Sequence, residues 1–95
     1  MNNEIFEQIL PVLHELFPDS TYEYQREADK DLFSFYIELK KNRYILKITG
    51  NCVDDHDIEK IKSHIKDVVF NILKENPNKF ITLKANFSCE ISEIG

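Results

Sequence analysis

The residues best suited to chemistry in this 95-residue chain lie in one short stretch: Cys52, Asp54, Asp55, His56 and Asp57. Cys52 and His56 are four residues apart, a spacing that on a helix places two zinc ligands on one face. A zinc site needs a second pair of ligands, however, and Asp54 and Asp57 are better explained as helix-cap and dipole partners. We therefore expect no metal ion and no other cofactor at this stretch.

The rest of the sequence contains no catalytic signature. No serine or cysteine lies in a nucleophile motif, and the two glycines cannot form a phosphate-binding loop. His14 and His64 lie beside apolar residues in helical patterns. Glu23 and Glu27 belong to an exposed strand pattern, with nothing apolar nearby to raise a carboxyl pKa. The sequence thus indicates that the protein is not an enzyme.

Charge is distributed unevenly along the chain. The net charge is −5, and residues 1–31 carry eight acidic and two basic residues, whereas residues 32–53 are net positive. An acidic chain is repelled by phosphates, which argues against nucleic-acid binding. The basic residues 40, 41, 43 and 47 follow Tyr36 closely, a mixture that can bind nucleic acid, but a solvated hairpin is the better explanation. We expect no direct contact with nucleic acid.

Composition predicts one globular domain over residues 1–95. Hydrophobic residues make up 42% and charged residues 31%, which is typical of a folded protein. We find neither a signal-peptide pattern nor an apolar run of membrane-spanning length, so the sequence predicts a cytoplasmic protein that contacts no membrane. In that reducing compartment Cys52 and Cys89 should be free thiols.

Hydrophobic periodicity defines the elements that position these residues. Apolar steps of three and four predict helices, and alternation predicts strands. The predicted helices cover residues 3–17 and 54–75, and the predicted strands cover residues 21–27, 32–40, 43–49 and 79–89, followed by a loose tail over residues 90–95. Pro11 lies inside the first helix, and Asp54 is the expected N-cap of the second. The expected fold is an α+β two-layer sandwich of order α-β-β-β-α-β, with both helices on one face of a four-stranded sheet.

The hairpin between the second and third strands sets the predicted register. A two-residue turn at Lys41 and Asn42 brings inward-facing residues opposite one another, and asparagine tolerates the left-handed conformation that such turns require. This register places Lys47 opposite Tyr36 and makes Tyr36 and Ile45 neighbours on the outer face. An aromatic and an aliphatic residue ringed by charges form a candidate hot spot for a partner.

The second helix contains a heptad-like apolar row. Ile58, Ile61, Ile65, Val68 and Ile72 recur in 3-4-3-4 spacing, which is typical of a coiled-coil seam. Val69, Phe70 and Leu73 widen the stripe, however, and only about three heptads are present. Packing against the sheet is therefore the favoured interpretation, and a coiled coil is the alternative.

Three resemblances bear on function, and the sequence indicates membership of none of these families. The α-β-β-β-α order resembles the double-stranded-RNA-binding domain, which implies a lysine cluster at the start of the second helix. Here Asp54, Asp55, His56 and Asp57 occupy the matching positions, so their charge excludes that role. The element order, acidic balance and leading helix also resemble type III secretion chaperones. Small acidic α+β chains of this kind resemble phage-encoded anti-restriction and anti-CRISPR inhibitors.

The sequence therefore predicts a non-enzymatic protein-binding domain, a small acidic inhibitor or adaptor that blocks a basic partner which handles nucleic acid. The alternative is a chaperone-like or dimeric adaptor that binds through an apolar surface, and the protein is expected to be a monomer or a homodimer. The candidate partner-binding residues are Glu23, Glu27, Asp29, Asp31, Tyr36, Ile45, Asp54, Asp55 and Asp57.

Overall fold

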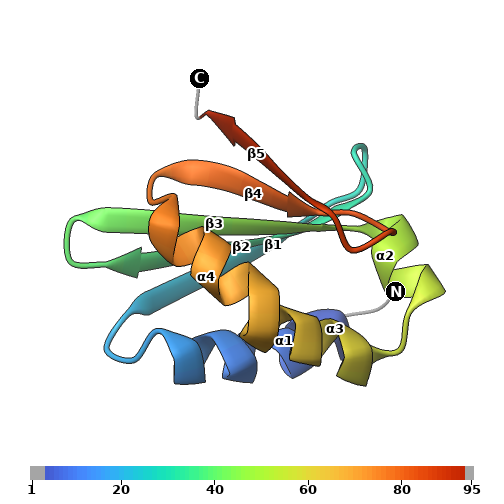
Figure 1. Cartoon of the computed structure of the whole chain (residues 1–95), viewed down its shortest axis with the longest axis horizontal. Helices are drawn as coiled ribbons and strands as arrows, with labels where there is room; N and C mark the ends of the chain where they lie inside the picture. The colour runs from blue at the N-terminus through green and yellow to red at the C-terminus, as the bar shows by residue number, and fades with distance from the viewer. Residues whose placement is uncertain (1–3, 94–95) are drawn as a thin grey trace.

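The computed structural model describes residues 4–93 as a two-layer α+β arrangement, in which a sheet lies on a layer of helices (Figure 1). The sheet has five strands in the order β1-β2-β3-β4-β5, so the prediction of four strands was wrong. All neighbouring strands are antiparallel except β3 and β4, which are parallel. Within residues 4–93 no helix is long and apolar enough to cross a membrane.

Helix α1 (Glu4–Leu16) follows the predicted pattern. Its buried face carries Ile5, Phe6 and Ile9, and the Phe6 ring packs edge-on against Phe33 and Phe35 of the sheet. Asn3, the first residue of the predicted helix, lies outside the described residues. Tertiary packing therefore holds this helix on the sheet despite the proline within it.

Pro11 lies on the exposed side of α1 and removes one backbone hydrogen bond. Because the helix is held by its buried face, we expect Pro11→Ala to leave the fold intact and to change the free energy of unfolding by at most about 1–2 kcal/mol. Urea unfolding followed by circular dichroism measures this change. Loss of the folded state in the variant would contradict the prediction.

Strands β1 (Thr21–Glu27), β2 (Leu32–Leu39) and β3 (Asn42–Thr49) form an antiparallel meander at the predicted positions. The predicted turn was wrong by one residue, since the turn is at Lys40 and Lys41. In this turn Lys40 takes the left-handed conformation, with φ 57°. Asn78 contacts the first residues of β3 beside this turn. Its backbone N–H donates to the Arg43 carbonyl at 2.7 Å and its side-chain oxygen accepts from the Arg43 N–H at 3.0 Å.

The region between β3 and β4 differs from the single predicted helix. The Thr49 side chain accepts from the Cys52 N–H at 3.1 Å and caps α2 (Gly50–Asp55). After a break at His56, a longer helix runs through α3 (Ile58–His64), the π-helical η1 (Ile65–Val69) and α4 (Phe70–Glu75). Asp57 therefore occupies the N-cap position predicted for Asp54, without a side-chain capping hydrogen bond.

The π-helical turn changes which residues the long helix buries. The buried row is Ile61, Ile65, Val69 and Leu73, which leaves Val68 40% exposed despite its place in the heptad pattern. This row packs into the same core as α1 and the inner face of the sheet. The long helix thus packs on the sheet, as the favoured interpretation predicted.

The last predicted strand, over residues 79–89, is a hairpin. β4 (Lys79–Leu83) turns at Lys84–Phe87 and returns as β5 (Cys89–Glu93), so residues 90–93 are a strand rather than a loose tail. Phe87 adopts the left-handed conformation with φ 66°, and its partly buried side chain packs against the hydrophobic core. Its ring stacks between His56 and His64, with centroids 4.1 and 4.5 Å away.

Candidate functional site

The face of the sheet opposite the helices is uncovered (Figure 1). Strand alternation places polar side chains there, and strand pairing arranges them in rows across the sheet. One row runs from Glu23 through Tyr36 and Ile45 to Phe80. A second row runs from Thr21 through Glu38 to Arg43. We call this surface the outer face.

A hydrogen-bonded ion pair lies at the centre of the outer face. The Lys47 ammonium donates to the Glu27 carboxylate at 2.7 Å and lies 3.3 Å from the Ser34 hydroxyl, which also donates to Glu27. The side chains of Lys47 and Glu27 are only 12% and 14% exposed. Hydrogen bonds from Lys47 and then Ser34 hold the pKa of Glu27 below its ordinary value of 4.5, against the opposing effect of burial. Glu27 therefore acts as a structural anion that Lys47 already neutralises.

Aromatic rings cover the apolar part of the outer face. The Lys47 ammonium lies 4.9 Å from the centre of the Phe80 ring and 5.7 Å from that of Tyr36. Ile45 lies directly between these two residues in the strand pairing and is only 2% exposed. Tyr36 and Ile45, predicted to be neighbours, are thus directly opposite one another in the strand pairing, and the Ile45 side chain is buried.

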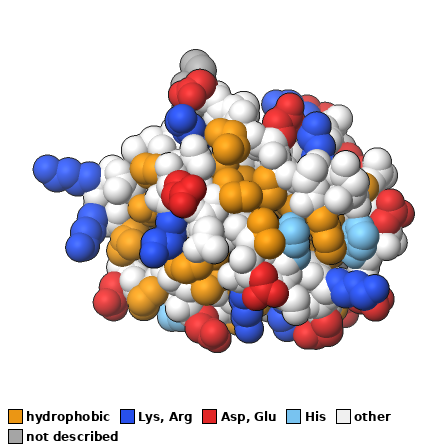
Figure 2. All heavy atoms as spheres, viewed as in Figure 1, with side chains coloured by type: hydrophobic (Ala, Val, Ile, Leu, Met, Phe, Trp, Pro, Cys, Tyr) orange, Lys and Arg blue, Asp and Glu red, His pale blue; other side chains and the backbone are white. Residues whose placement is uncertain are grey.

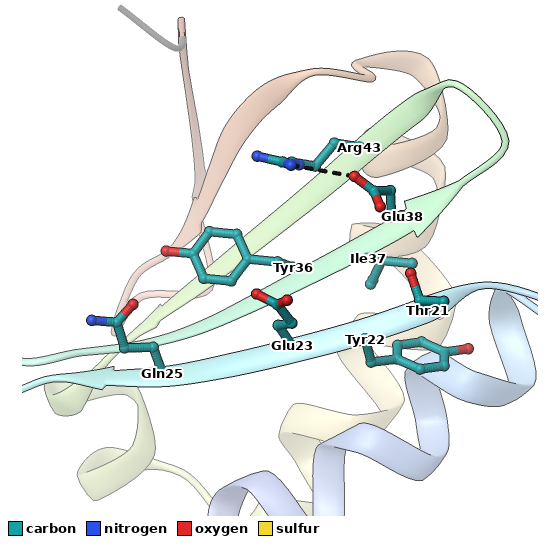
Figure 3. A pocket seen from close by; sticks show the side chains of 8 residues that line it. All are labelled: Thr21, Tyr22, Glu23, Gln25, Tyr36, Ile37, Glu38 and Arg43. Atoms are coloured by element: carbon teal, nitrogen blue, oxygen red, sulfur yellow. Dashed lines mark hydrogen bonds and ion pairs between the residues drawn. The ribbon is translucent and has the colours of Figure 1, made fainter.

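A shallow groove of about 310 Å³ crosses the outer face (Figure 3). Its lining includes Glu23, Tyr36, Glu38 and Arg43. The guanidinium of Arg43 pairs with the Glu38 carboxylate at 3.2 Å, and both side chains are more than half exposed. Glu23 is exposed, and no residue between 4 and 93 forms a hydrogen bond or ion pair with its side chain. The groove therefore combines an aromatic wall with one free carboxylate and one paired carboxylate.

The remaining predicted residues lie at one end of the sheet. The Asp31 carbonyl accepts from the Gly50 N–H at 2.8 Å, so the β1–β2 loop with Asp29 packs against the start of α2. The Asp31 carboxylate pairs with Arg26 at 2.7 Å. Asp54 and Asp57 line a separate hollow of about 500 Å³ between α1 and α3. Asp55 is exposed at the last residue of α2. The predicted residues thus divide between two surfaces rather than forming one site.

The chemistry available on these surfaces is limited. No group of three or more metal-binding side chains occurs in the described part of the chain. Ser34 is fully buried and its hydroxyl donates to Glu27, so an external substrate cannot reach it as a nucleophile. Both cysteines are free thiols, and burial raises the pKa of Cys52 to about 11, which disfavours a reactive thiolate.

The sequence prediction missed several residues of the outer face. Glu38 and Arg43 line the groove. Lys47 and Phe80 contact one another beside it on the outer face. None of these four was among the predicted binding residues. Period-2 alternation was the signal for Glu38, Arg43 and Lys47, whereas Phe80 joins them only through the parallel pairing of β3 with β4. No protein-family model matches this chain, and no curated protein or solved structure matches it either.

Proposed function

We propose that this chain is a non-enzymatic protein-binding domain, a small acidic inhibitor or adaptor that takes a basic segment of a partner protein into the groove of the outer face. Glu23 carries the proposal, because its carboxylate is exposed beside Tyr36 and has no hydrogen-bond or ion-pair partner among residues 4–93. A partner arginine there would stack on the Tyr36 ring and pair with Glu23. The pair formed by Arg43 and Glu38 provides an example of guanidinium binding within the same groove.

The net charge supports a partner that handles nucleic acid. A chain with a net charge of −5 is attracted to the basic surfaces with which such proteins hold phosphates, and its carboxylates would occupy the phosphate positions. Blocking of this kind is what an inhibitor of the anti-restriction or anti-CRISPR type would do. We propose such a role in the cytoplasm, with no direct contact to nucleic acid.

A labelled arginine-rich peptide is the probe for this proposal, with binding followed by fluorescence anisotropy at about 0.15 M salt, where the Debye length is about 8 Å. We expect the double variant Glu23→Gln/Glu38→Gln to bind about tenfold more weakly, because it removes both carboxylates from the groove. Added salt should weaken binding of the parent protein steeply. Both side chains are exposed, so the variant should remain folded.

The matched control is Glu7→Gln/Glu15→Gln, which removes the same charge from exposed positions of α1. This control should bind within about twofold of the parent protein, because long-range effects of total charge are weak beyond a Debye length. Equal losses in the two double variants would show that only net charge matters. That result would overturn the assignment of the groove.

A further inference from the structure

Strand β5 ends the sheet with an unprotected edge. It pairs with β4 on one side, and no strand within residues 4–93 pairs with its other side. Natural edge strands are usually protected by charged side chains, above all lysine, by proline, a bulge, a short length or a covering element. The sequence of β5 contains no proline or lysine, and its pairing with β4 is continuous. Its two glutamates are already paired with lysines, Glu93 with Lys79 at 3.3 Å and Glu90 with Lys84 at 3.4 Å.

An apolar patch lies beside this edge. Of the three exposed large hydrophobic residues in the described chain, two are Ile91 on β5, at 47% exposure, and Val68 on η1, at 40%. The ring nitrogen of His64 donates to the Phe87 carbonyl at 3.1 Å, so this side of the long helix faces the β4–β5 hairpin. Val68 follows His64 by four residues on that side. Figure 2 shows hydrophobic side chains gathered in this region, between β5 and the long helix.

The opposite edge of the sheet does not have these properties. The third exposed hydrophobic residue, Tyr24 on β1, stacks on Phe6 with ring centroids 4.7 Å apart. Its ring therefore already has a partner within the chain. Strand β1 also carries four charged or amide side chains, at positions 23, 25, 26 and 27. The β5 edge is the better candidate for pairing with another chain.

We propose that β5 pairs antiparallel with β5 of a second copy of this chain, which continues the sheet across a two-fold axis at Ile91. This register places the two Ile91 side chains opposite one another, Cys89 opposite Glu93 of the other copy, and Glu90 opposite Ser92 of the other copy. No two like charges then face each other directly. A two-fold axis at Glu90 would instead place two glutamates opposite one another.

The register at Ile91 also joins the apolar patches. Residues opposite one another in a strand pair lie on the same face of the sheet, so both helix layers lie on one side of the dimer. The patches that contain Ile91 and Val68 then meet at the two-fold axis, and their burial adds to the backbone hydrogen bonds of a short strand pair. An isologous contact of this kind closes after two copies, so it forms a dimer rather than a fibre.

Sedimentation velocity over a range of protein concentrations tests the dimer. We expect a dimer in the parent protein and at least a tenfold weaker association, about 1.4 kcal/mol, in Ile91→Lys, because lysine on an edge strand opposes pairing. Val68→Lys changes the same patch from another element and should also weaken the dimer. Tyr24→Lys, at the opposite edge, is the control and should associate like the parent protein. Circular dichroism of each variant confirms folding.

Added salt should change the strength of the dimer and the affinity for a basic peptide in opposite directions. Each copy carries a net charge of −5, so salt screens the repulsion between copies and should strengthen the dimer, whereas it weakens binding of a basic peptide. A monomeric parent protein at all concentrations would overturn the dimer and leave the groove unaffected. A dimer that persists in both Ile91→Lys and Val68→Lys would place the interface elsewhere and also overturn the proposal.

Cysteine cross-linking tests the register itself. Glu93→Cys places a thiol opposite the native Cys89 of the other copy, at the separation of directly paired strand residues, which a disulfide can span. We expect mild oxidation to give a covalent dimer of this variant. Ser92→Cys, on the opposite face of the strand, should give none through Cys89. Equal cross-linking of the two variants, or none in Glu93→Cys, would exclude the two-fold axis at Ile91.

Discussion

Replacing Lys47 by methionine is expected to lower the free energy of unfolding by about 2–3 kcal/mol, because it leaves a mostly buried carboxylate without its charged donor. Of the side-chain hydrogen bonds that Glu27 accepts within residues 4–93, the one from Ser34 would then remain. Methionine has nearly the same length and still packs against Phe80, so loss of the charge rather than loss of volume is measured. Urea unfolding at neutral pH gives the value.

Two further variants establish the cause. The double variant Glu27→Leu/Lys47→Met removes both charges together. It should be more stable than Lys47→Met alone, because no unpaired charge remains. Lys66→Met removes an exposed lysine that has no ion pair in the described chain, and it should change stability by no more than about 0.5 kcal/mol. If Lys66→Met and Lys47→Met were equally destabilised, loss of the ion pair would not explain the lower stability of Lys47→Met.

The effect of Lys47→Met also depends on pH. The folded protein holds the pKa of Glu27 below 4.5, so the ionised carboxylate contributes stability above that pH. This contribution is lost as the pH falls through the lowered pKa and Glu27 takes up a proton in the folded state. The difference in stability between the parent protein and Lys47→Met should therefore be largest near neutral pH and should shrink in acid. A difference that grew with acidification would contradict this assignment.

Phe87→Ala is the second change with a large expected effect, a loss of about 2–3 kcal/mol. The Phe87 ring stacks on His56 and His64, and the backbone of its hairpin accepts a hydrogen bond from each histidine, at 2.5 Å on Ala85 and 3.1 Å on Phe87 itself. Phe87 also holds a left-handed backbone conformation, which a non-glycine residue keeps only where its surroundings fix it. Loss of the ring should therefore loosen the hairpin as well as remove buried surface.

Thermal or urea unfolding measures the total loss of stability in Phe87→Ala. Proton NMR of the histidine rings reports whether the stacking around position 87 is lost. In the parent protein the stacked Phe87 ring should shift the ring protons of His56 and His64, and these shifts should disappear in Phe87→Ala. Phe87→Leu keeps an apolar side chain without an aromatic ring and should lose roughly half as much stability. An unfolding midpoint equal to that of the parent protein would show that the histidines hold the hairpin without the ring.

Periodicity in the sequence was sufficient to predict α1, the first three strands and the face of the sheet on which each of their side chains lies. A side chain's face depends only on local geometry, since successive strand residues alternate and helical residues three or four apart align. The predicted turn at Lys41 and Asn42, one residue too late, illustrates this. It shifted the pairing of β2 and β3 by two residues, and a shift of two leaves every side chain on the predicted face.

The later elements could not be predicted in this way, because their boundaries depend on distant contacts. Alternation continues from Lys79 to Cys89, but the chain turns at Phe87, whose ring is held by two histidines 23 and 31 residues earlier. The predicted second helix breaks at His56, whose ring bonds to the carbonyl of Ala85 rather than remaining in a helical turn. Local pattern carries no information about either contact.

In the candidate binding site too, some features follow from the sequence pattern and others from distant contacts. Sequence alone determined that Glu23, Tyr36 and Glu38 share the outer face, because they belong to alternating strands. Only the tertiary structure decided which of the acids is available. Lys47 lies 20 residues from Glu27 and neutralises it, whereas Glu23 has no such neighbour between residues 4 and 93. The charge of a residue is written in the sequence, but its pairing depends on which strands are adjacent and in what register, and these are set by packing of the whole chain.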